Sequence, residues 1–574
     1  MEYKPENICC QNCKKDFIIE PEDFLFYEKI KVPAPTFCPE CRLIRRLIMR
    51  NERGLYKRKC DMCNQDKILV YPQDSIYKVY CRECFNSDNW DAINYGKNYD
   101  FTKTFFGQYM DLYNSVPRVG IVKQGFSINS EYTNRATDLK NCYLIYASAY
   151  SENCSYCLFI WEVKDSMDCF SVDKSERCFS CIDCNNSNNL KYSKDCNSCI
   201  DSYFLKNCRN CQNCFGCVNL RNKNYCIFNE QFTKDEYLHK IKEFDLSNSN
   251  NILKTKEIFN NFSYKFPNVY MESYHADDVS GNWINNSKNT KFSFTCNNIE
   301  NGKYLFNIKE AKDAMDYSHW GKGSELMYEC NSVGMQCSNI KFSSESWDQL
   351  INAEYCHNCF SSSNLFGCVG LKKKQYCILN KQYTKEEYEE LIPKIKQHMN
   401  DMPFIDKVGR TIKYGEFFPC DMVPFAYNES IASEYFPKTK EEVLKMGFRW
   451  KDIDKKNYVP SIMGDDLPQS ISEVTDDILN EVIGCTHKGE CNHQCTLAFK
   501  IIPDELQFYR VNNIPLPTLC PNCRHYDRLK DRNPIKLWHR SCMKEGCTNS
   551  FETIYAPDRP EIVYCKECYQ KEVY

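Results

Sequence analysis

The chain has 574 residues, a length that allows about four domains of roughly 150 residues each. Its 74 lysines and arginines nearly balance 77 aspartates and glutamates, so the net charge of −3 excludes a chain-wide attraction for nucleic acid or for an anionic membrane. No run of about 18 apolar residues occurs, and the first residues lack the apolar segment of a signal peptide. We therefore expect a cytoplasmic protein with no membrane partner.

Forty cysteines dominate the composition. In a chain without a secretion signal, so many cysteines favour metal binding over a disulfide framework. Nine lie in 1–84, fourteen in 142–226, seven in 296–377, one is Cys420 and nine lie in 485–568. The two ends are therefore rich in paired cysteines, and the middle is organised differently.

The two ends of the chain repeat one cysteine pattern. A short cysteine pair is followed by a long spacer and then by Cys38-Pro-Glu-Cys41-Arg in one copy and Cys520-Pro-Asn-Cys523-Arg in the other. A second unit of two pairs follows at each end. The four predicted sets are Cys10, Cys13, Cys38 and Cys41; Cys60, Cys63, Cys81 and Cys84; Cys491, Cys495, Cys520 and Cys523; and Cys542, Cys547, Cys565 and Cys568.

Two cysteine knuckles separated by roughly 17 to 24 residues suit tetrahedral zinc, because each turn presents two thiolates to one ion. We expect the spacer, such as FIIEPEDFLFY, to form a hairpin that joins the knuckles. With four thiolates per set no position is left open, so we predict about four structural Zn²⁺ per chain. Packing of cysteines as small apolar side chains would explain one pair better than eight. Further candidates for these sites are Cys9, Cys485, His487 and His493.

The first unit of each end resembles zinc-ribbon domains with the pattern of a cysteine pair, an FYxxxG-like segment, a proline and CPxCR. The glycine of that pattern is absent from FYEKIKVPAPTFCPECR and FYRVNNIPLPTLCPNCR. The segments FAYNESIASEYFPKTKEE (425–442) and YAPDRPEIVYC (555–565) extend the similarity to zinc-ribbon proteins of candidate-phyla bacteria. The resemblance covers the full length and implies zinc ribbons, but no particular activity.

A three-residue period marks the first cysteine-rich middle segment. All fourteen cysteines between 142 and 226 share one phase, and every third residue from Ser127 is small or apolar except Lys223. Many spacings are multiples of twelve, which predicts a β-solenoid over 127–228 with four inward side chains per rung. Such a rung is about 40 Å around, so its interior is narrow. Rung length and phase are similar to those of beetle antifreeze proteins, although nothing else here suggests ice binding.

The same reading continues from Ile284 to Cys377 and predicts a second solenoid over 281–379. In this phase the core would also hold Tyr317, Trp320 and Trp347. Its core is therefore less rich in cysteine than that of the first solenoid.

The two solenoids end alike, because 215–237 and 366–388 are similar segments 151 residues apart. Each contains a capping-box spacing, at Thr233 and Thr384, which predicts a helix that covers the last rung and blocks edge-to-edge association. Two short helices are expected in EYFPKTKEEVLKMGFRW and SEVTDDILNEVIG.

The predicted fold is mainly β, with two short-rung solenoids between double zinc ribbons and a few connecting helices. The order is a double zinc ribbon (1–100), a connector (101–126), the first solenoid (127–228), a capping helix and linker (229–280), the second solenoid (281–379), a capping helix and connector (380–480), and a double zinc ribbon (481–574).

Basic side chains follow the second knuckle of each end. Residues 42–59 carry a local charge of +7, and the arginines recur at three- and four-residue steps, which on a helix makes one cationic ridge. The ridges are Arg42, Arg45, Arg46 and Arg50 in one copy and Arg524, Arg528 and Arg532 in the other. Such ridges suit the phosphates of RNA or a ribonucleoprotein. The alternative is that they pair with acidic loops such as EPED (20–23) and solubilise the domain.

Catalysis receives little support, since the nine histidines are scattered and no Gly-rich phosphate loop or Ser/His/Asp order stands out. We expect a non-catalytic zinc protein that binds RNA through the ribbon surfaces. A protein-interaction scaffold that uses the aromatic solenoid flanks is the alternative. A third class is a solenoid enzyme or an iron–sulfur electron carrier built on Cys208, Cys211, Cys214 and Cys217. Ser, Leu, Ile and Val occupy the same phase in neighbouring rungs, which favours packing over iron.

Overall fold

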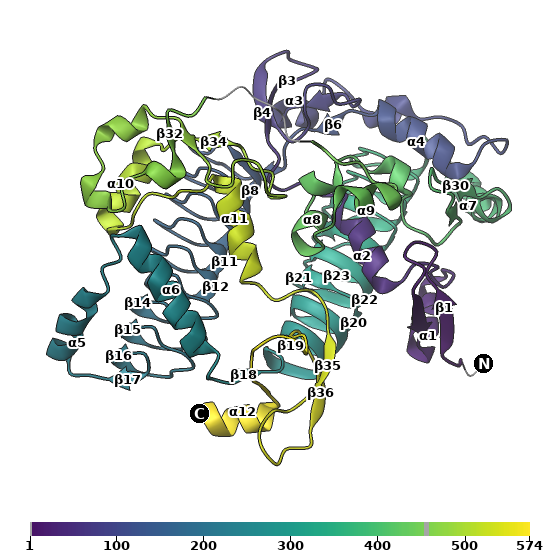
Figure 1. The fold of residues 1–574 in the computed structure, drawn as a ribbon. Helices are drawn as coiled ribbons and strands as arrows, with labels where there is room; N and C mark the ends of the chain where they lie inside the picture. The colour runs from purple at the N-terminus through teal and green to yellow at the C-terminus, as the bar shows by residue number, and fades with distance from the viewer. Residues whose placement is uncertain (1–2, 453–458) are drawn as a thin grey trace.

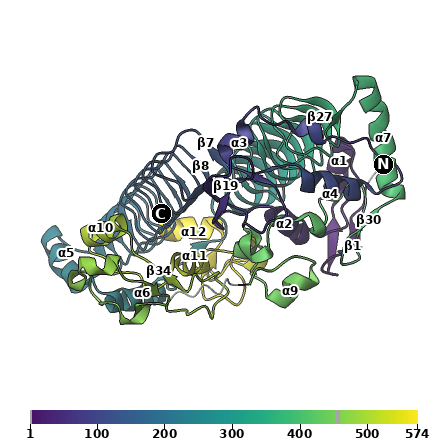
Figure 2. The ribbon, with the colours of Figure 1, turned by 90° about the horizontal axis from the view of Figure 1, so that it is seen from above.

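A computed structural model describes residues 3–452 and 459–574, so positions 453–458 of the predicted connector lie outside the described residues. Two stacks of short parallel strands form the middle of the molecule and lie side by side, with cysteine-rich units from both chain ends packed on them (Figures 1 and 2). The mainly β prediction with two solenoids is confirmed. Among the described residues, no helix combines the length and apolar character needed to cross a membrane.

In the first solenoid, strands of successive rungs pair in parallel at a spacing of twelve residues, as Leu158 with Phe170 and Phe170 with Ile182. The predicted phase points inward: Cys178, Cys181 and Cys199 are fully buried. Its rung strands are β8 (Thr133–Thr137), β9 (Ile145–Ala149), β10 (Leu158–Trp161), β11 (Phe170–Asp173), β12 (Ile182–Asn185), β13 (Asn188–Lys191), β14 (Ile200–Tyr203), β15 (Gln212–Phe215) and β16 (Asn224–Ile227).

The solenoid corners explain the abundance of asparagine and aspartate. The residue before most inward positions is left-handed, as Asn141 (φ 50°) and Asn153 (φ 53°), a conformation that Asn and Asp tolerate best after glycine. These amides form ladders along the stack: Asn129 Nδ2 donates to Asn141 Oδ1 at 3.0 Å, and Asn141 Nδ2 to Asn153 Oδ1 at 3.1 Å. The outer corners therefore stabilise rung-to-rung register as the inner thiols and hydroxyls do.

The second solenoid contains three rungs of thirteen residues. Ala311 pairs with Ser324, Glu325 with Ser338, and Ser338 with Ile351. Its strands are β19 (Ser273–Asn297), β20 (Ile299–Lys303), β21 (Phe306–Ile308), β22 (Ala311–Trp320), β23 (Ser324–Gly334), β24 (Ser338–Lys341), β25 (Ser344–Trp347), β26 (Ile351–Glu354), β27 (Ser363–Phe366) and β28 (Gln375–Ile378).

The extra residues shift the inward phase, so part of the predicted core is wrong. Tyr317 is fully buried as expected, but Trp320 and Trp347 are only half-buried. Each longer rung takes up its extra residue at a corner of consecutive left-handed residues. Three occur from His319 to Gly321, and two at Met335 (φ 62°) with Gln336 (φ 60°) and at Asp348 (φ 61°) with Gln349 (φ 59°). After each such corner the inward positions move by one residue, so Cys337 enters the core outside the predicted phase; after the third corner the predicted phase returns at Leu350.

Helices cap both solenoids as predicted. α5 (Lys234–Lys240) and α7 (Lys385–Asp401) each begin with a complete capping box, at Thr233 and Thr384. The connectors contain α4 (Phe105–Ser115), α6 (Ser249–Ser263), α8 (Ala432–Tyr435) and α9 (Lys440–Lys445). SEVTDDILNEVIG forms two 3₁₀ turns, Ile471–Glu473 and Asp476–Leu479, in place of the expected short helix.

The spacers between the cysteine pairs contain a helix where a hairpin was predicted. FIIEPEDFLFY forms β2 (Asp16–Ile19) and then α1 (Pro21–Ile30), because proline opens the first helical turn and Glu22 and Asp23 follow it near the positive end of the helix dipole. The C-terminal copy forms α10 (Pro503–Asn512) in the same way.

The first cysteine-rich unit of each chain end packs on the solenoid that is further away in sequence. α2 (Pro39–Leu47) lies on the second solenoid, against β22 and β23, and α11 (Pro521–Lys530) lies on the first (Figure 1). The chain ends therefore cross over the middle: the N-terminal end contacts the second solenoid and the C-terminal end contacts the first.

Candidate metal centres and the cleft between the solenoids

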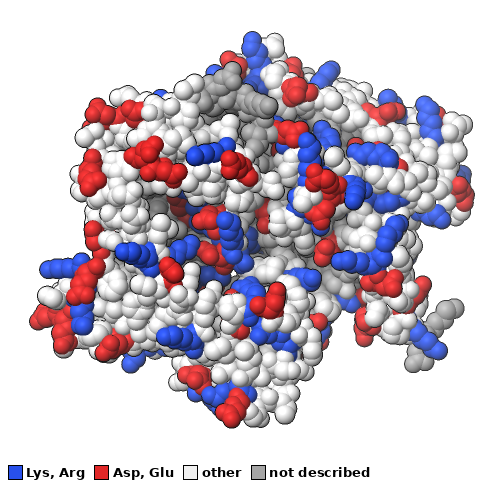
Figure 3. All heavy atoms as spheres, in the orientation of Figure 1, with Lys and Arg blue, Asp and Glu red and all other residues white. Residues whose placement is uncertain are grey.

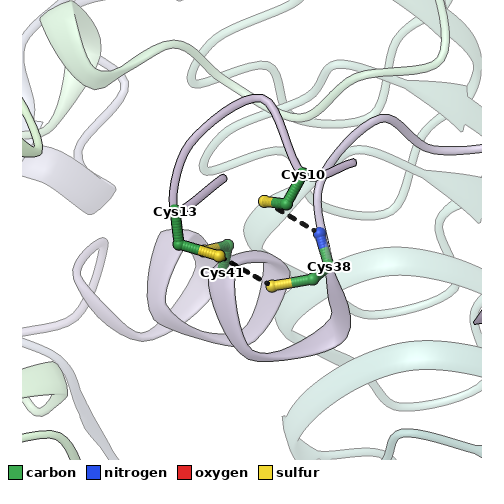
Figure 4. A group of neighbouring side chains, drawn as sticks. All are labelled: Cys10, Cys13, Cys38 and Cys41. Carbon is green, nitrogen blue, oxygen red and sulfur yellow. Dashed lines mark hydrogen bonds between the residues drawn. The ribbon is translucent and has the colours of Figure 1, made fainter. Parts of the chain in front are cut away.

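Four thiols converge at the first N-terminal knuckle pair. Cys10 and Cys13 lie in the turn between β1 (Glu6–Cys9) and β2, Cys38 caps α2, and Cys41 lies in its first turn. Figure 4 shows the four side chains pointing toward one another, and their sulfur atoms lie within 4.8 Å of each other. The Cys13 Sγ to Cys38 Sγ distance of 3.7 Å matches the edge of about 3.8 Å that a tetrahedral ion with 2.3 Å sulfur bonds requires.

The same construction recurs in all four sets. The third cysteine caps a helix, α2, α3 (Arg82–Asn86), α11 or α12 (Lys566–Val573), and its backbone N–H donates to the thiol of the first. The four N to Sγ distances are Cys38 to Cys10, 3.2 Å; Cys81 to Cys60, 3.2 Å; Cys520 to Cys485, 3.3 Å; and Cys565 to Cys542, 3.3 Å. Helix N-termini and N–H donors favour the thiolate that a metal needs.

Cys60 illustrates how backbone N–H donors favour the thiolate. Burial alone would raise the pKa of its thiol, but backbone N–H donors from Cys63 and Cys81 outweigh burial and lower the pKa to about 7. A thiol with that pKa loses its proton readily to a borderline-soft cation near neutral pH.

The third set contains Cys485 where we predicted Cys491. Cys485 joins Cys495, Cys520 and Cys523, and it accepts the N–H bond that Cys10 accepts in the first set. Nine residues separate Cys485 from Cys495, against two in the N-terminal copy, so counting back from the spacer that the two copies share reaches Cys491 in place of Cys485. The other three predicted sets come together as written, and Cys9 is exposed on β1 outside its set.

Cys208, Cys211, Cys214 and Cys217 occupy successive inward positions of the first solenoid. Their thiols donate to the backbone carbonyls two residues earlier, at 3.3 to 3.6 Å. These contacts are those of thiols packed inside a rung.

The predicted N-terminal arginine ridge is not a free surface, because it is buried against the second solenoid. Arg42 Nε lies 2.8 Å from Asp316 Oδ2, and Arg46 Nη1 lies 3.0 Å from Asp316 Oδ1. The two arginines and the aspartate are at most 1% exposed. Arg42 also stacks on Tyr304, with 5.4 Å between the guanidinium carbon and the ring centroid. One solenoid carboxylate therefore receives two ribbon arginines.

The C-terminal ridge is buried in the same way. Arg524 Nη1 lies 3.0 Å from Asp168 Oδ2, Arg528 Nη1 lies 2.6 Å from Asp168 Oδ1, and Arg524 stacks on Tyr156. Asp168 and Asp316 are 148 residues apart, as are Tyr156 and Tyr304, which is the 151-residue offset of the solenoid ends less the three added residues of the longer rungs. The whole contact is thus duplicated.

The remaining predicted arginines are also engaged. Arg45 bridges Glu329 and Glu416 at 3.0 Å each, Arg50 pairs with Glu52, and Arg532 stacks on Phe170 and Tyr435. Placing these side chains on phosphates would expose the carboxylates that they now neutralise. In this conformation the ridges hold the cysteine-rich units of the two chain ends against the solenoids.

A large cleft separates the two solenoids, with a volume of about 2020 Å³. Four of the seven tryptophans of the chain line it, and α12 contributes Tyr569. Trp320 and Trp347 lie together, with ring centroids 5.7 Å apart. Sequence reasoning missed this site, because it assigned both rings to the core. The lining tryptophans are Trp161, Trp283, Trp320 and Trp347.

Charges of both signs accompany the tryptophans. Arg209 and Arg221 line the cleft beside Asp183 and Glu272, and the face in Figure 3 likewise mixes basic and acidic side chains. Burial in the cleft wall, with the nearby charge of Asp195, raises the pKa of Asp183 to about 6 and that of Glu272 to about 7. The cleft therefore becomes more negative as the pH rises through this range.

Comparisons with known proteins find no matching family model and no matching curated protein. One similar solved structure is a "putative acetyltransferase" from Desulfovibrio desulfuricans G20, at 9% identity over 50% of this chain and 86% of that one. Its TM-score of 0.09 carries no argument about fold or activity.

Proposed function

We propose that this chain is a non-catalytic zinc-ribbon protein that binds single-stranded RNA, or the exposed RNA of a ribonucleoprotein, in the cleft between its solenoids. The observation that carries the proposal is the gathering of four of the seven tryptophans on that cleft. The buried arginine contacts give the ribbons a different role from the expected one, because they hold the two solenoids in place around the cleft.

Zinc is the metal that the cysteine sets favour. Each set offers four thiolates at tetrahedral spacing with no open position, which suits Zn²⁺ in a structural role. The zinc-ribbon resemblance at both ends supports the same metal. Each ion would tie a β-hairpin turn to a helix start, and two of the four would so hold α2 and α11, the helices whose arginines reach the solenoids.

Metal analysis of the full chain from zinc-supplemented cells should return at least about four zinc ions per chain and negligible iron, because four closed thiolate sets are present. Inductively coupled plasma mass spectrometry, referenced to amino-acid analysis, gives the ratio. A ratio near two, or a brown protein that contains iron, would contradict the zinc assignment.

RNA fits the cleft because unpaired bases stack on aromatic faces, at about 1–3 kcal/mol per base, without requiring a particular sequence. Arg209, Arg221 and Lys322 line the same cleft and add positive charge for phosphates, and asparagine amides of the solenoid corners offer hydrogen bonds to base edges. Because the lining carries both signs of charge, stacking supplies more of the affinity than counterion release.

Replacing Trp320 and Trp347 together by alanine should weaken binding of a labelled single-stranded oligouridine by about tenfold or more, because two stacking platforms are lost. Fluorescence anisotropy with the full chain measures the dissociation constants. Trp538→Ala is the matched control, since Trp538 lies on β35 (Trp538–Ser541) away from the cleft. Equal loss in both variants would contradict the cleft as the site.

The same titration should show tighter binding at about pH 5.5 than at about pH 8. Asp183 and Glu272 have raised pKa values, so both are mainly neutral at the lower pH and charged at the higher, where they repel phosphates. Failure of every RNA probe, with capture of a protein partner lost in the double tryptophan variant, would favour the scaffold function.

A further inference from the structure

The first knuckle of the C-terminal ribbon holds a loop that the other three sets lack. Nine residues separate Cys485 from Cys495, whereas two to four separate the corresponding cysteines elsewhere. The seven residues added relative to the N-terminal copy bring in three metal-binding side chains, His487, Cys491 and His493. A loop that served only to close the knuckle would need none of them.

These three side chains meet at the edge of the cysteine set. One ligand atom of each lies within 4.8 Å of the others and of Cys523 Sγ. The Cys491 Sγ to Cys523 Sγ distance is 3.6 Å, close to the 3.7 Å between Cys13 and Cys38 in the first set. It also matches the tetrahedral edge of about 3.8 Å expected for two thiolates on one zinc ion.

Ring contacts hold the two imidazoles in place, but one nitrogen of each has no hydrogen-bond partner among the described residues. His493 stacks on Tyr526 with 5.1 Å between centroids and 4° between planes, and the rings of His487 and His493 lie 5.4 Å apart. Nδ1 of each histidine is shielded from solvent and has no hydrogen-bond partner among the residues that the structure describes. Because buried polar atoms are nearly always paired, this pair of rings points to a ligand.

We propose that His487, Cys491, His493 and Cys523 bind a fifth metal ion, with the Cys523 thiolate shared between this ion and the neighbouring set of Cys485, Cys495 and Cys520. Two nitrogen and two sulfur donors in a compact group select zinc. The C-terminal ribbon then holds a binuclear centre.

Charge favours the shared arrangement. A single zinc ion with four thiolates leaves a net charge of −2 in a site whose cysteines are buried. A second zinc ion with the Cys491 thiolate brings the pair to −1, since four positive charges meet five thiolates. Less uncompensated charge in a buried site lowers its desolvation cost.

The fifth site rests on the proposed zinc function, and one experiment distinguishes failure of the fifth site from failure of the zinc function. Zinc ions per chain are counted in three zinc-loaded, full-length proteins: the wild type and two double variants. The first variant combines His487→Ala with His493→Ala. The control variant combines His239→Ala with His539→Ala, at two exposed histidines. We expect about five ions per chain in the wild type and the control, and about four in the first variant.

A wild-type count near four would overturn the fifth site and leave the zinc function standing, and a count below four would overturn both. Five ions in the wild type that persist without both histidines would overturn this location. Cobalt-loaded wild type supplies a readout that does not depend on a variant folding. A shared thiolate couples two cobalt ions, so the electron paramagnetic resonance intensity should fall below that of isolated ions, whereas unreduced intensity would overturn the bridge.

Discussion

Replacing Asp316 by asparagine is expected to lower the free energy of unfolding by about 3–5 kcal/mol, because it leaves Arg42 and Arg46 buried with one charge fewer. Arg42 and Arg46 each bond to one oxygen of this carboxylate, and none of the three residues is more than 1% exposed. Urea denaturation followed by tryptophan fluorescence measures the change, and limited proteolysis shows whether the N-terminal ribbon detaches from the second solenoid.

Asp313→Asn is the matched control. Asp313 lies on the same strand three residues away, and its ion pair with Lys29 at 2.9 Å is at the surface, where such pairs contribute about 0–1 kcal/mol. Adding Arg46→Met to Asp316→Asn should recover part of the loss, because the buried charges balance again. Equal stability of the two asparagine variants would contradict a stabilising role for the contact of Asp316 with Arg42 and Arg46.

Cys181→Lys is expected to unfold the first solenoid, whereas Cys181→Ser should be nearly neutral. Cys181 is fully buried, and its thiol donates to the carbonyls of Phe179 and Leu190 at 3.5 and 3.4 Å. Serine makes such bonds at neighbouring inward positions, as Ser166 Oγ does to Lys164 O at 2.7 Å. A lysine there would bury an unpaired charge at a cost of several kcal/mol.

Circular dichroism and size-exclusion chromatography compare these variants with Glu176→Lys, a lysine at an exposed position of the same stack. Loss of strand signal in Cys181→Lys alone is the expected result. A folded Cys181→Lys protein would mean that this residue faces solvent and that the inward phase is wrong.

Local residue spacing was sufficient to predict the two solenoids and three of the four cysteine sets. The phase shared by Cys142 through Cys226 repeats at a period that only an inward-facing rung position explains, and the Cys-x-x-Cys knuckles contain both of their ligands within one turn. The capping boxes at Thr233 and Thr384 are likewise complete within four residues. Each of these features is determined by residues a few positions apart, so the sequence alone shows it.

Features that depend on a single inserted residue or loop were not predicted from the spacing. A thirteen-residue rung changes the phase by one position, and that is enough to move Trp320 and Trp347 from the predicted core to the wall of the cleft. The long loop after Cys485 likewise led to Cys491 being predicted in the set where the structure has Cys485, because the spacing of a repeat does not show where an insertion lies.

Only the tertiary structure decided the role of the arginines. Sequence placed Arg42 and Arg46 on one helix face and Arg524 and Arg528 on its copy, and that placement is correct. A cationic face serves an RNA phosphate or a buried carboxylate equally well, and the choice depends on what packs against it. Asp316 and Asp168, from rungs 270 and 360 residues away from Arg46 and Arg528, meet these helices only because the chain ends cross over the middle. Local spacing fixes which side chains share a face, whereas long-range packing determines which charges they meet.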